Sequence, residues 1–400
     1  MAVAGIDLRA FVVDRLLARN AASRALFDRE AERLARACEQ MSDRFLRGGR
    51  LLAFGRGAAA TDAQHVSVEF VHPVIVGKRA LPALDLSAAF ERWVPALATD
   101  ADIVMGFSSP DGDIAVAATL AAARARGAQT FALPGGRDAP NASDAHFAID
   151  PPSDDPFVSQ ELIEILYHTL WETVHVFFEH RDCGHDDVGA SAFLYPFLGG
   201  SRQDTSGVVA DVASSIRAKA ADDERLREEA ARDQSDQIAA AVTAVLSRLE
   251  AGATLLMFGN GGSATDANDW ALDCVTPPRG APAIRALSLS MEPANVTAIA
   301  NDIGAEAIFL RQLIAHGRRG DVAIAISTSG GSANVIAALN AARRRGMLTV
   351  ALLGYDGGEI ARRGLADLPV VVRCDYIPRI QEVQASIYHV MVDAWRRWIG

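Results

Sequence analysis

The chain has 400 residues, half of them apolar, and this is more than one hydrophobic core normally organises, so two domains are expected. The formal charge of −11 argues against sequence-independent binding of nucleic acid, although backbone dipoles can still hold a small anion. The apolar runs are too short to span a bilayer and the N-terminus lacks a signal-peptide pattern, so we expect a cytoplasmic protein without membrane contact.

Helices and strands alternate along the first half. Apolar residues recur at helical spacing between Asp7 and Arg47, which predicts one or two amphipathic helices. Short apolar runs that end at turn residues predict strands, and the amphipathic stretches between them predict helices. The expected elements are a strand at 51–54, a helix at 61–70, a strand at 103–107, a helix at 115–126, a strand at 130–133 and a helix at 158–178. The opening amphipathic pattern returns at 214–249.

The second half repeats the first. Three segments align with later ones at offsets of 204, 219 and 221 residues, which grow as insertions in loops would make them. The aligned pairs are Gly55–Glu69 with Gly259–Asp273, Asp102–Gly127 with Asp321–Gly346, and Gln160–His168 with Gln381–His389. We therefore expect two tandem domains, 1–182 and 205–400, joined by a connection at 183–204.

Two glycine loops in the second half have the composition of an anion site. Each follows an apolar run and opens a helix, as GNGGSATDA at 259–267 and STSGGS at 327–332. Glycines allow close backbone approach, and the first N–H groups of a helix and its dipole favour a phosphate. Ordinary turns are the alternative, but two such loops in order favour the site. The candidate residues are Asn260, Gly261, Gly262, Ser263, Ser327, Thr328, Ser329 and Ser332.

The corresponding loops of the first half are damaged. Pro110 replaces Ser329 and has no N–H to donate, while Asp113 replaces Ser332 with a charge that repels phosphate. Ala58 and Ala59 stand where the second half has Gly262 and Ser263. Arg56, in place of Asn260, is the only change that favours an anion. We expect phosphate binding to be lost in this half.

Four blocks of the second half resemble the sugar isomerase (SIS) family, and within it the phosphoheptose isomerases. They are GNGGSATDA, TAIANDIGAEAIFLRQL, DVAIAISTSGGSANVIAALNAARRRGM and RIQEVQASIYHVMVD. The resemblance implies two tandem SIS domains, each a flavodoxin-like α/β/α sandwich with a central parallel sheet and an N-terminal helical extension. It also implies a phosphosugar ligand and no nucleotide cofactor. The halves are expected to pair as an intrachain pseudo-dimer, and two chains as a homodimer with four SIS domains.

The resemblance also assigns a metal site to the first half. His65, Glu69, Gln160 and His168 match family positions that bind a divalent metal, usually Zn²⁺. Imidazole and carboxylate suit zinc, whereas a buried structural histidine is the alternative for each residue alone. The second half has Asp269 and Asp273 with Gln381 and His389, a set that suits a harder cation or no metal. Since Gln160 and His168 lie about 12 Å apart along one helix, a site shared between domains or subunits is expected.

The implied reaction is an aldose–ketose isomerisation through an enediol, from sedoheptulose 7-phosphate to D-glycero-D-manno-heptose 7-phosphate. The family pattern makes Glu69 the base and His168 the acid, with Asp273 and His389 at the same positions of the second half. Asn301 and Asp302 are expected to contact sugar hydroxyls, with a turn or helix cap as the alternative. Two other functions remain open. One is a non-catalytic phosphosugar-binding or regulatory protein, and the other is an isomerase for another phosphosugar or an amino-sugar phosphate.

Overall fold

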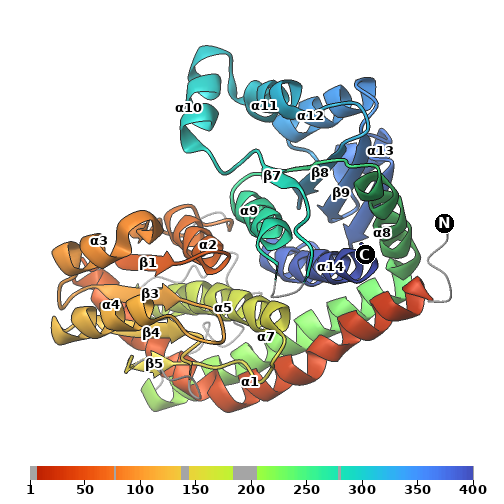
Figure 1. Ribbon diagram of the computed structural model, residues 1–400. Coiled ribbons are helices and arrows are strands. Elements are labelled where there is room, and N and C mark those ends of the chain that lie inside the picture. The colour runs from red at the N-terminus through yellow and green to blue at the C-terminus, as the bar shows by residue number, and fades with distance from the viewer. Residues whose placement is uncertain (1–6, 76–77, 137–143, 183–204, 278–280, 400) are drawn as a thin grey trace. The chain divides into compact units, whose positions relative to one another are not determined.

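The computed structural model describes residues 7–75, 78–136, 144–182, 205–277 and 281–399 (Figure 1). Its described residues form two compact units, Asn20–Asp222 and Met1–Arg19 with Asp223–Gly400. We call them the N-terminal and the C-terminal unit. Helices α1 (Leu8–Leu46) and α7 (Thr205–Asp233) each contribute to both, so these units do not coincide with the ranges 1–182 and 205–400. The connection expected at 183–204 lies outside the described residues.

The N-terminal unit contains a sheet of five parallel strands in the order β2-β1-β3-β4-β5. Each strand expected from a short apolar run is present, and the opening amphipathic pattern forms the single long helix α1. The further elements are β1 (Leu51–Gly55), α2 (Ala59–Val71), β2 (Ala83–Asp85), η1 (Ser87–Ala89), α3 (Phe90–Leu97), β3 (Ile103–Phe107), α4 (Ile114–Ala125), β4 (Gln129–Leu133), β5 (Phe147–Ala148) and α5 (Pro156–Asp182).

Alternating side chains of this sheet enter two different cores. Leu51 and Ala53 of β1 pack into a cluster that includes residues of α1, α2 and α5. Leu52 and Phe54 point the other way, into a cluster with α3 and α4. Because successive side chains of a strand face opposite sides of the sheet, both faces must be covered, and the unbroken apolar runs follow from this requirement. The unit is therefore a three-layer α/β/α sandwich.

The C-terminal unit has five parallel strands in the order β10-β9-β8-β6-β7. Figure 1 shows α11 and α12 on one side of this sheet and α9 and α14 on the other. Its elements are α8 (Ser235–Glu250), β6 (Leu255–Phe258), α9 (Gly262–Val275), β7 (Ala286–Ser288), α10 (Pro293–Asp302), η3 (Ala305–Ala307), α11 (Ile308–His316), β8 (Val322–Ser327), α12 (Ala333–Arg344), β9 (Leu348–Gly354), α13 (Gly358–Arg362), β10 (Leu368–Val372) and α14 (Ile377–Trp398).

Both sheets follow the same flavodoxin-like strand order, with the first strand of each between the second and the third. This match confirms the expected duplication and fold class. In such sheets ligands bind beyond the carboxyl ends of the strands where the chain order reverses, which here is between β6 and β8 and between β1 and β3. Among the described residues, no helix combines the length and apolar composition that crossing a membrane requires.

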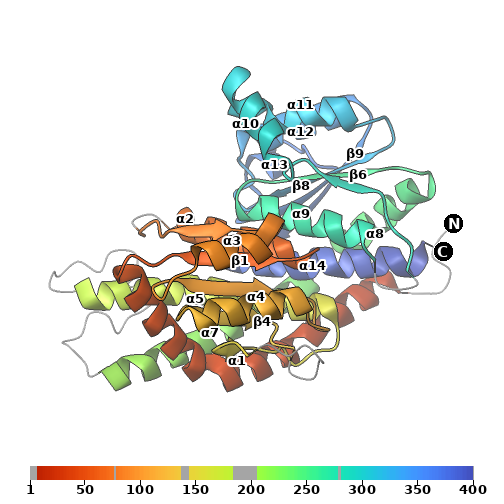
Figure 2. The same ribbon diagram turned by 60° about the vertical axis from the view of Figure 1, so that its left-hand side comes forward.

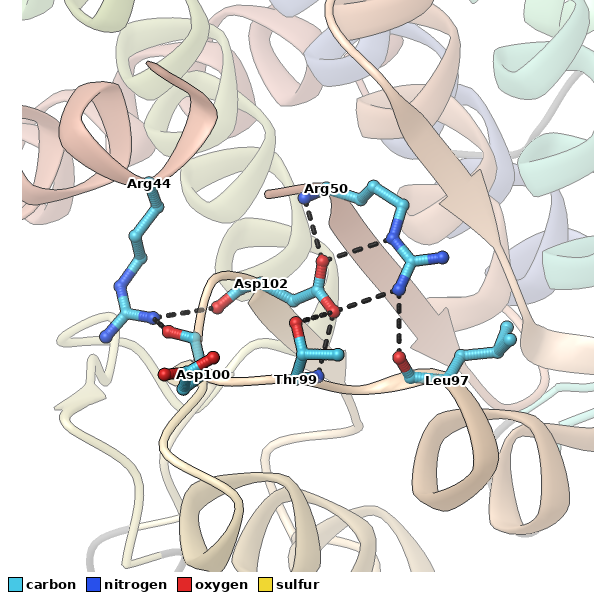
Figure 3. Close-up of polar contacts among 6 residues, drawn as sticks. All are labelled: Arg44, Arg50, Leu97, Thr99, Asp100 and Asp102. Carbon is cyan, nitrogen blue, oxygen red and sulfur yellow. Dashed lines mark hydrogen bonds and ion pairs between the residues drawn. The ribbon is translucent and has the colours of Figure 1, made fainter. Parts of the chain in front are cut away.

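A buried carboxylate anchors the start of β3 in the N-terminal unit (Figure 3). Asp102 accepts hydrogen bonds from the backbone and guanidinium of Arg50 at 2.9–3.1 Å, and from the backbone and hydroxyl of Thr99 at 2.8 and 2.9 Å. Burial alone would raise the pKa of Asp102, but these hydrogen bonds outweigh it and lower the pKa below its usual value. Asp321, the matching residue of the C-terminal unit, accepts from Thr254 and Arg318 backbone N–H groups at 2.9 and 2.8 Å.

Asp102→Ala is expected to lower the free energy of unfolding by about 3 kcal/mol, because it removes a buried acceptor from several donors at once. Asp321→Ala, the matched control, should cost about 1–2 kcal/mol, since two backbone donors lose their acceptor. Urea unfolding of both variants measures the difference. Because the folded pKa is depressed, the contribution of Asp102 is present above its ordinary pKa and is lost as the pH falls through the folded one. Equal losses in the two variants would contradict this comparison.

Candidate functional site

The two glycine loops of the C-terminal unit lie side by side. They follow adjacent parallel strands, in which Phe258 of β6 pairs with Ala325 of β8. Asn260 in the first loop and Asn334 in the first turn of α12 exchange two hydrogen bonds, each 2.9 Å long. This reciprocal amide pair joins the beginnings of α9 and α12 at the carboxyl edge of the sheet. The loops therefore meet at the position where open α/β sheets bind ligands.

The residue that precedes each of these two helices does not cap it, although the Asn334 side chain accepts the N–H of Val335 in the first turn of α12 at 2.9 Å. Gly261 precedes α9 with a positive φ of 57°, and Ser332 precedes α12, neither with a side-chain hydrogen bond to the helix. Gly330 has a φ of 59°, and a Cβ there would lie 2.2 Å from the Gly357 carbonyl oxygen, so the turn requires glycine. The hydroxyls of Ser327 and Ser329 each accept a backbone N–H of the loop at 3.2 Å. Uncharged hydroxyl and main-chain N–H groups thus line the loop before α12.

The remaining loop candidates differ in exposure. Ser263 and Ser327 are buried, Thr328 is half-buried, and Ser329 is exposed. The sugar-contact candidates Asn301 and Asp302 lie elsewhere, at the end of α10. They are exposed and joined by a hydrogen bond of 2.8 Å. Figure 2 shows α10 beside α11, and none of the described hydrogen bonds connects these two residues to the loops.

In the N-terminal unit a carboxylate occupies the equivalent helix beginning. Asp113 precedes α4 and accepts hydrogen bonds from the N–H groups of Ala115 and Val116 at 2.8 and 3.1 Å. An aspartate cap satisfies the donors that a bound anion would otherwise use, and its charge repels phosphate. Asp113 therefore caps the helix that follows it, whereas Ser332 at the matching position does not cap α12.

Arg56 does not leave a free positive charge at this loop. Its guanidinium lies 3.0 Å from Glu91 and 3.6 Å from Asp113, over the ring of Phe90. Two carboxylates thus lie beside Arg56, the one replacement in this loop that favours an anion. This arrangement supports the expectation that the N-terminal loop does not bind phosphate.

The N-terminal unit instead gathers buried histidines and carboxylates between α2 and α5. The Nε2 atoms of His65 and His168 are 3.3 Å apart, and Glu69 Oε1 lies 3.8 Å from His65 Nε2. Burial, and then the neighbouring His168, hold the pKa of His65 well below its usual value. The imidazole is therefore neutral at pH 7, which is the form that binds metals and transfers protons. Three of the four residues assigned from the resemblance lie together.

Helix α5 also carries Gln160 and Glu164. The Gln160 amide donates a hydrogen bond of 3.2 Å to Asp62. Glu164, which the sequence comparison missed, has a carboxylate oxygen within 4.8 Å of the ligand atoms of His65 and His168. Its position four residues before His168 was the available signal, because such a pair shares one helix face.

The C-terminal unit forms a more acidic group between α9 and α14. Nε2 of His389 lies 3.4 Å from Asp269 and 3.2 Å from Asp273. Tyr388, a second residue missed from the sequence, donates its hydroxyl to Asp269 at 2.8 Å. Gln381 is buried on α14, two turns before His389.

Neutralising Asp273 is expected to stabilise the metal-free protein above about pH 6. Burial, and then the Asp269 carboxylate, raise the pKa of Asp273 to about 6, with His389 opposing them in part. The folded chain holds this proton more tightly than the unfolded one, so stability falls as the pH rises between about 4 and 6 and stays reduced above. Asp273→Asn should raise the melting temperature near pH 8 and leave it unchanged below pH ~4. An equal effect at both pH values would contradict the assignment.

Two groups in the described part of the chain have donors close enough to share a metal ion, His65 with Glu164 and His168, and Asp269 with Asp273 and His389. Two imidazoles and a carboxylate match the donors that zinc prefers. The second group offers one nitrogen and two carboxylates, which favours a harder cation. The N-terminal group therefore fits a zinc-like ion better.

Comparison with known proteins identifies the family. An SIS domain model matches residues 220–354. The phosphoheptose isomerase of Pelodictyon phaeoclathratiforme is 41% identical over 180 residues, 44% of this chain and 84% of that protein. The phosphoheptose isomerase of Geobacter sp. is 44% identical over 167 residues, 41% of this chain and 84% of the relative. The C-terminal domain of glucosamine-fructose-6-phosphate aminotransferase from Francisella tularensis shares the fold, with a TM-score of 0.61, 10% identity, and coverage of 99% of this chain and 98% of that one. The chain belongs to the SIS domain family.

Proposed function

We propose that the protein is a phosphosugar aldose–ketose isomerase that converts sedoheptulose 7-phosphate to D-glycero-D-manno-heptose 7-phosphate. The observation that carries the proposal is the amide pair of Asn260 and Asn334, which joins the beginnings of two helices at adjacent strand ends, where neither preceding residue caps its helix. The relatives reported above bear the name phosphoheptose isomerase and supply the choice of sugar.

The C-terminal loops hold the phosphoryl group in this account. Main-chain N–H groups at the beginnings of α9 and α12 donate to its oxygens, and the hydroxyls of Ser263, Ser327 and Ser329 add neutral donors. Because the phosphoryl does not react, its binding energy fixes the position of the distant carbonyl carbon. In this proposal Asn301 and Asp302 contact sugar hydroxyls. The proposed assembly is a homodimer with four SIS domains.

Proton transfer requires one base and one acid. A base takes the proton from the carbon next to the carbonyl, the electron pair forms an enediol, and the proton returns to the neighbouring carbon. Glu69 is the proposed base and His168 the proposed acid that moves a proton between the two oxygens. Asp273 and His389 occupy the matching positions of the C-terminal unit. A divalent cation, when bound by the N-terminal group, supplies Lewis-acid polarisation of the carbonyl.

One observation favours a second candidate, a non-catalytic phosphosugar-binding protein. Asp269 is engaged by the hydroxyl of Tyr388 and lies beside His389, so the C-terminal unit pairs its loops with an altered acid–base group. Such a protein would bind the phosphosugar without converting it.

Incubation of the purified full chain with sedoheptulose 7-phosphate, with and without a chelator, tests the proposal. Isomerisation observed by NMR supports the enzyme, and loss of turnover on chelation supports a metal requirement. Binding measured by calorimetry without any conversion would establish the second candidate. Neither binding nor conversion would remove both.

A further inference from the structure

Glu164 lies in a group of buried residues with possible metal-ligand atoms. The resemblance does not assign Glu164 to the metal. Its carboxylate, His65 and His168 each place a ligand atom within 4.8 Å of the other two, and all three side chains are buried. Two of them come from α5 and one from α2, so two packed helices fix the group. We propose that Glu164 is a metal ligand, and that with His65 and His168 it completes a divalent-cation site inside the N-terminal unit.

Helix geometry favours Glu164 over Gln160 as the partner of His168. Residues four apart rise about 6 Å and share one face, whereas Gln160 and His168 are about 12 Å apart along α5. The Gln160 amide already donates to Asp62 at 3.2 Å, one turn before His65 on α2. Glu164 can therefore supply the oxygen ligand from the same copy of α5 as His168. Gln160 would have to supply it from another copy of this helix.

The charges of the group are also consistent with a cation. The carboxylates of Glu164 and Glu69 are 4% and 1% exposed. Two imidazoles and one carboxylate are a donor set that zinc accepts in proteins.

The C-terminal unit provides an internal comparison. At the 221-residue offset Ala385 takes the place of Glu164, and at the 204-residue offset Asp269 takes the place of His65. Two of the three ligands are thus missing or changed. The proposal predicts one tight zinc-type site per chain, in the N-terminal unit, with an affinity that does not depend on protein concentration because one unit supplies all the ligands.

Metal titration of the full-length protein tests the proposal without reference to turnover. Purified apoprotein is loaded with Zn²⁺ or Co²⁺, and the bound metal is measured by elemental analysis and competitive titration. Loss of an outer-shell partner weakens metal binding about 10- to 100-fold, so Glu164→Gln should weaken it by about 100-fold or more. Glu161→Gln, the same change at a buried neighbour on the same helix, should keep one equivalent. Gln160→Ala should also keep it.

Retention of tight metal by Glu164→Gln, or no tight site in the wild type, overturns the proposal. If Glu164→Gln does not fold, X-ray absorption spectroscopy of the metal-loaded wild type identifies the ligands instead. We expect two imidazole nitrogens and a carboxylate oxygen bound to the metal. A spectrum with only one imidazole ligand would contradict the proposal. The catalytic meaning of the site rests on the proposed function. A metal-loaded protein without isomerase activity would contradict that function and leave the ligand assignment intact.

Discussion

Ser332→Asp is expected to raise KM for the phosphosugar by roughly 30- to 1000-fold, the equivalent of about 2–4 kcal/mol. The substitution places a carboxylate before α12, as Asp113 does before α4. There the Asp113 carboxylate accepts hydrogen bonds from two first-turn N–H groups. An aspartate at this position takes donors from the phosphoryl group and repels it. Steady-state kinetics with sedoheptulose 7-phosphate measure the effect.

The reciprocal change is the matched control. Asp113→Ser should leave KM unchanged, and it should cost little stability because serine is also a good helix cap. If Ser332→Asp left KM unaltered while Asp113→Ser changed it, the phosphoryl site would have to be reassigned to the N-terminal loop. Each variant carries the residue that the other repeat has at the matching position, and circular dichroism of both variants checks that they fold.

Glu69→Gln is expected to lower kcat by about 10²- to 10⁴-fold with a small change in KM, which is the usual contribution of a general base. The amide keeps the shape of the side chain but cannot accept the proton. Asp273→Asn, the matching change in the C-terminal unit, should lower kcat by less than about tenfold. Single-turnover rates of both variants, measured at equal metal content, separate loss of the base from loss of metal.

A reversed result would assign the chemistry differently. Should Asp273→Asn abolish turnover while Glu69→Gln leaves it intact, the base would belong to the C-terminal unit. The pKa of about 6 for Asp273 would then appear in the pH dependence of kcat.

Local patterns predicted the parts of the fold that depend on short-range physics. The runs at 51–54 and 103–107 are strands, and a helix follows each glycine loop, because short apolar runs and glycine turns act within a few residues. The division into units was not predictable in this way. Helices α1 and α7 each take part in both units, which depends on packing between segments distant in sequence.

The site shows the same limit. The glycines and hydroxyls at 259–263 and 327–332 identified the loops, but the Asn260–Asn334 pair that joins them links residues 74 positions apart. The charge of Asp113 predicted repulsion, whereas its role as a cap required the helix geometry. The resemblance does not assign Glu164, because it places a metal ligand at Gln160 of the same helix, whose amide instead donates to Asp62 of α2.

A crystal structure of the protein with bound sedoheptulose 7-phosphate tests the phosphoryl site most directly. We predict phosphoryl oxygens within hydrogen-bond distance of the Ser327 or Ser329 hydroxyl and of first-turn N–H groups of α9 and α12. A phosphoryl group bound instead beside Arg56 and Asp113 in the N-terminal unit would contradict the account.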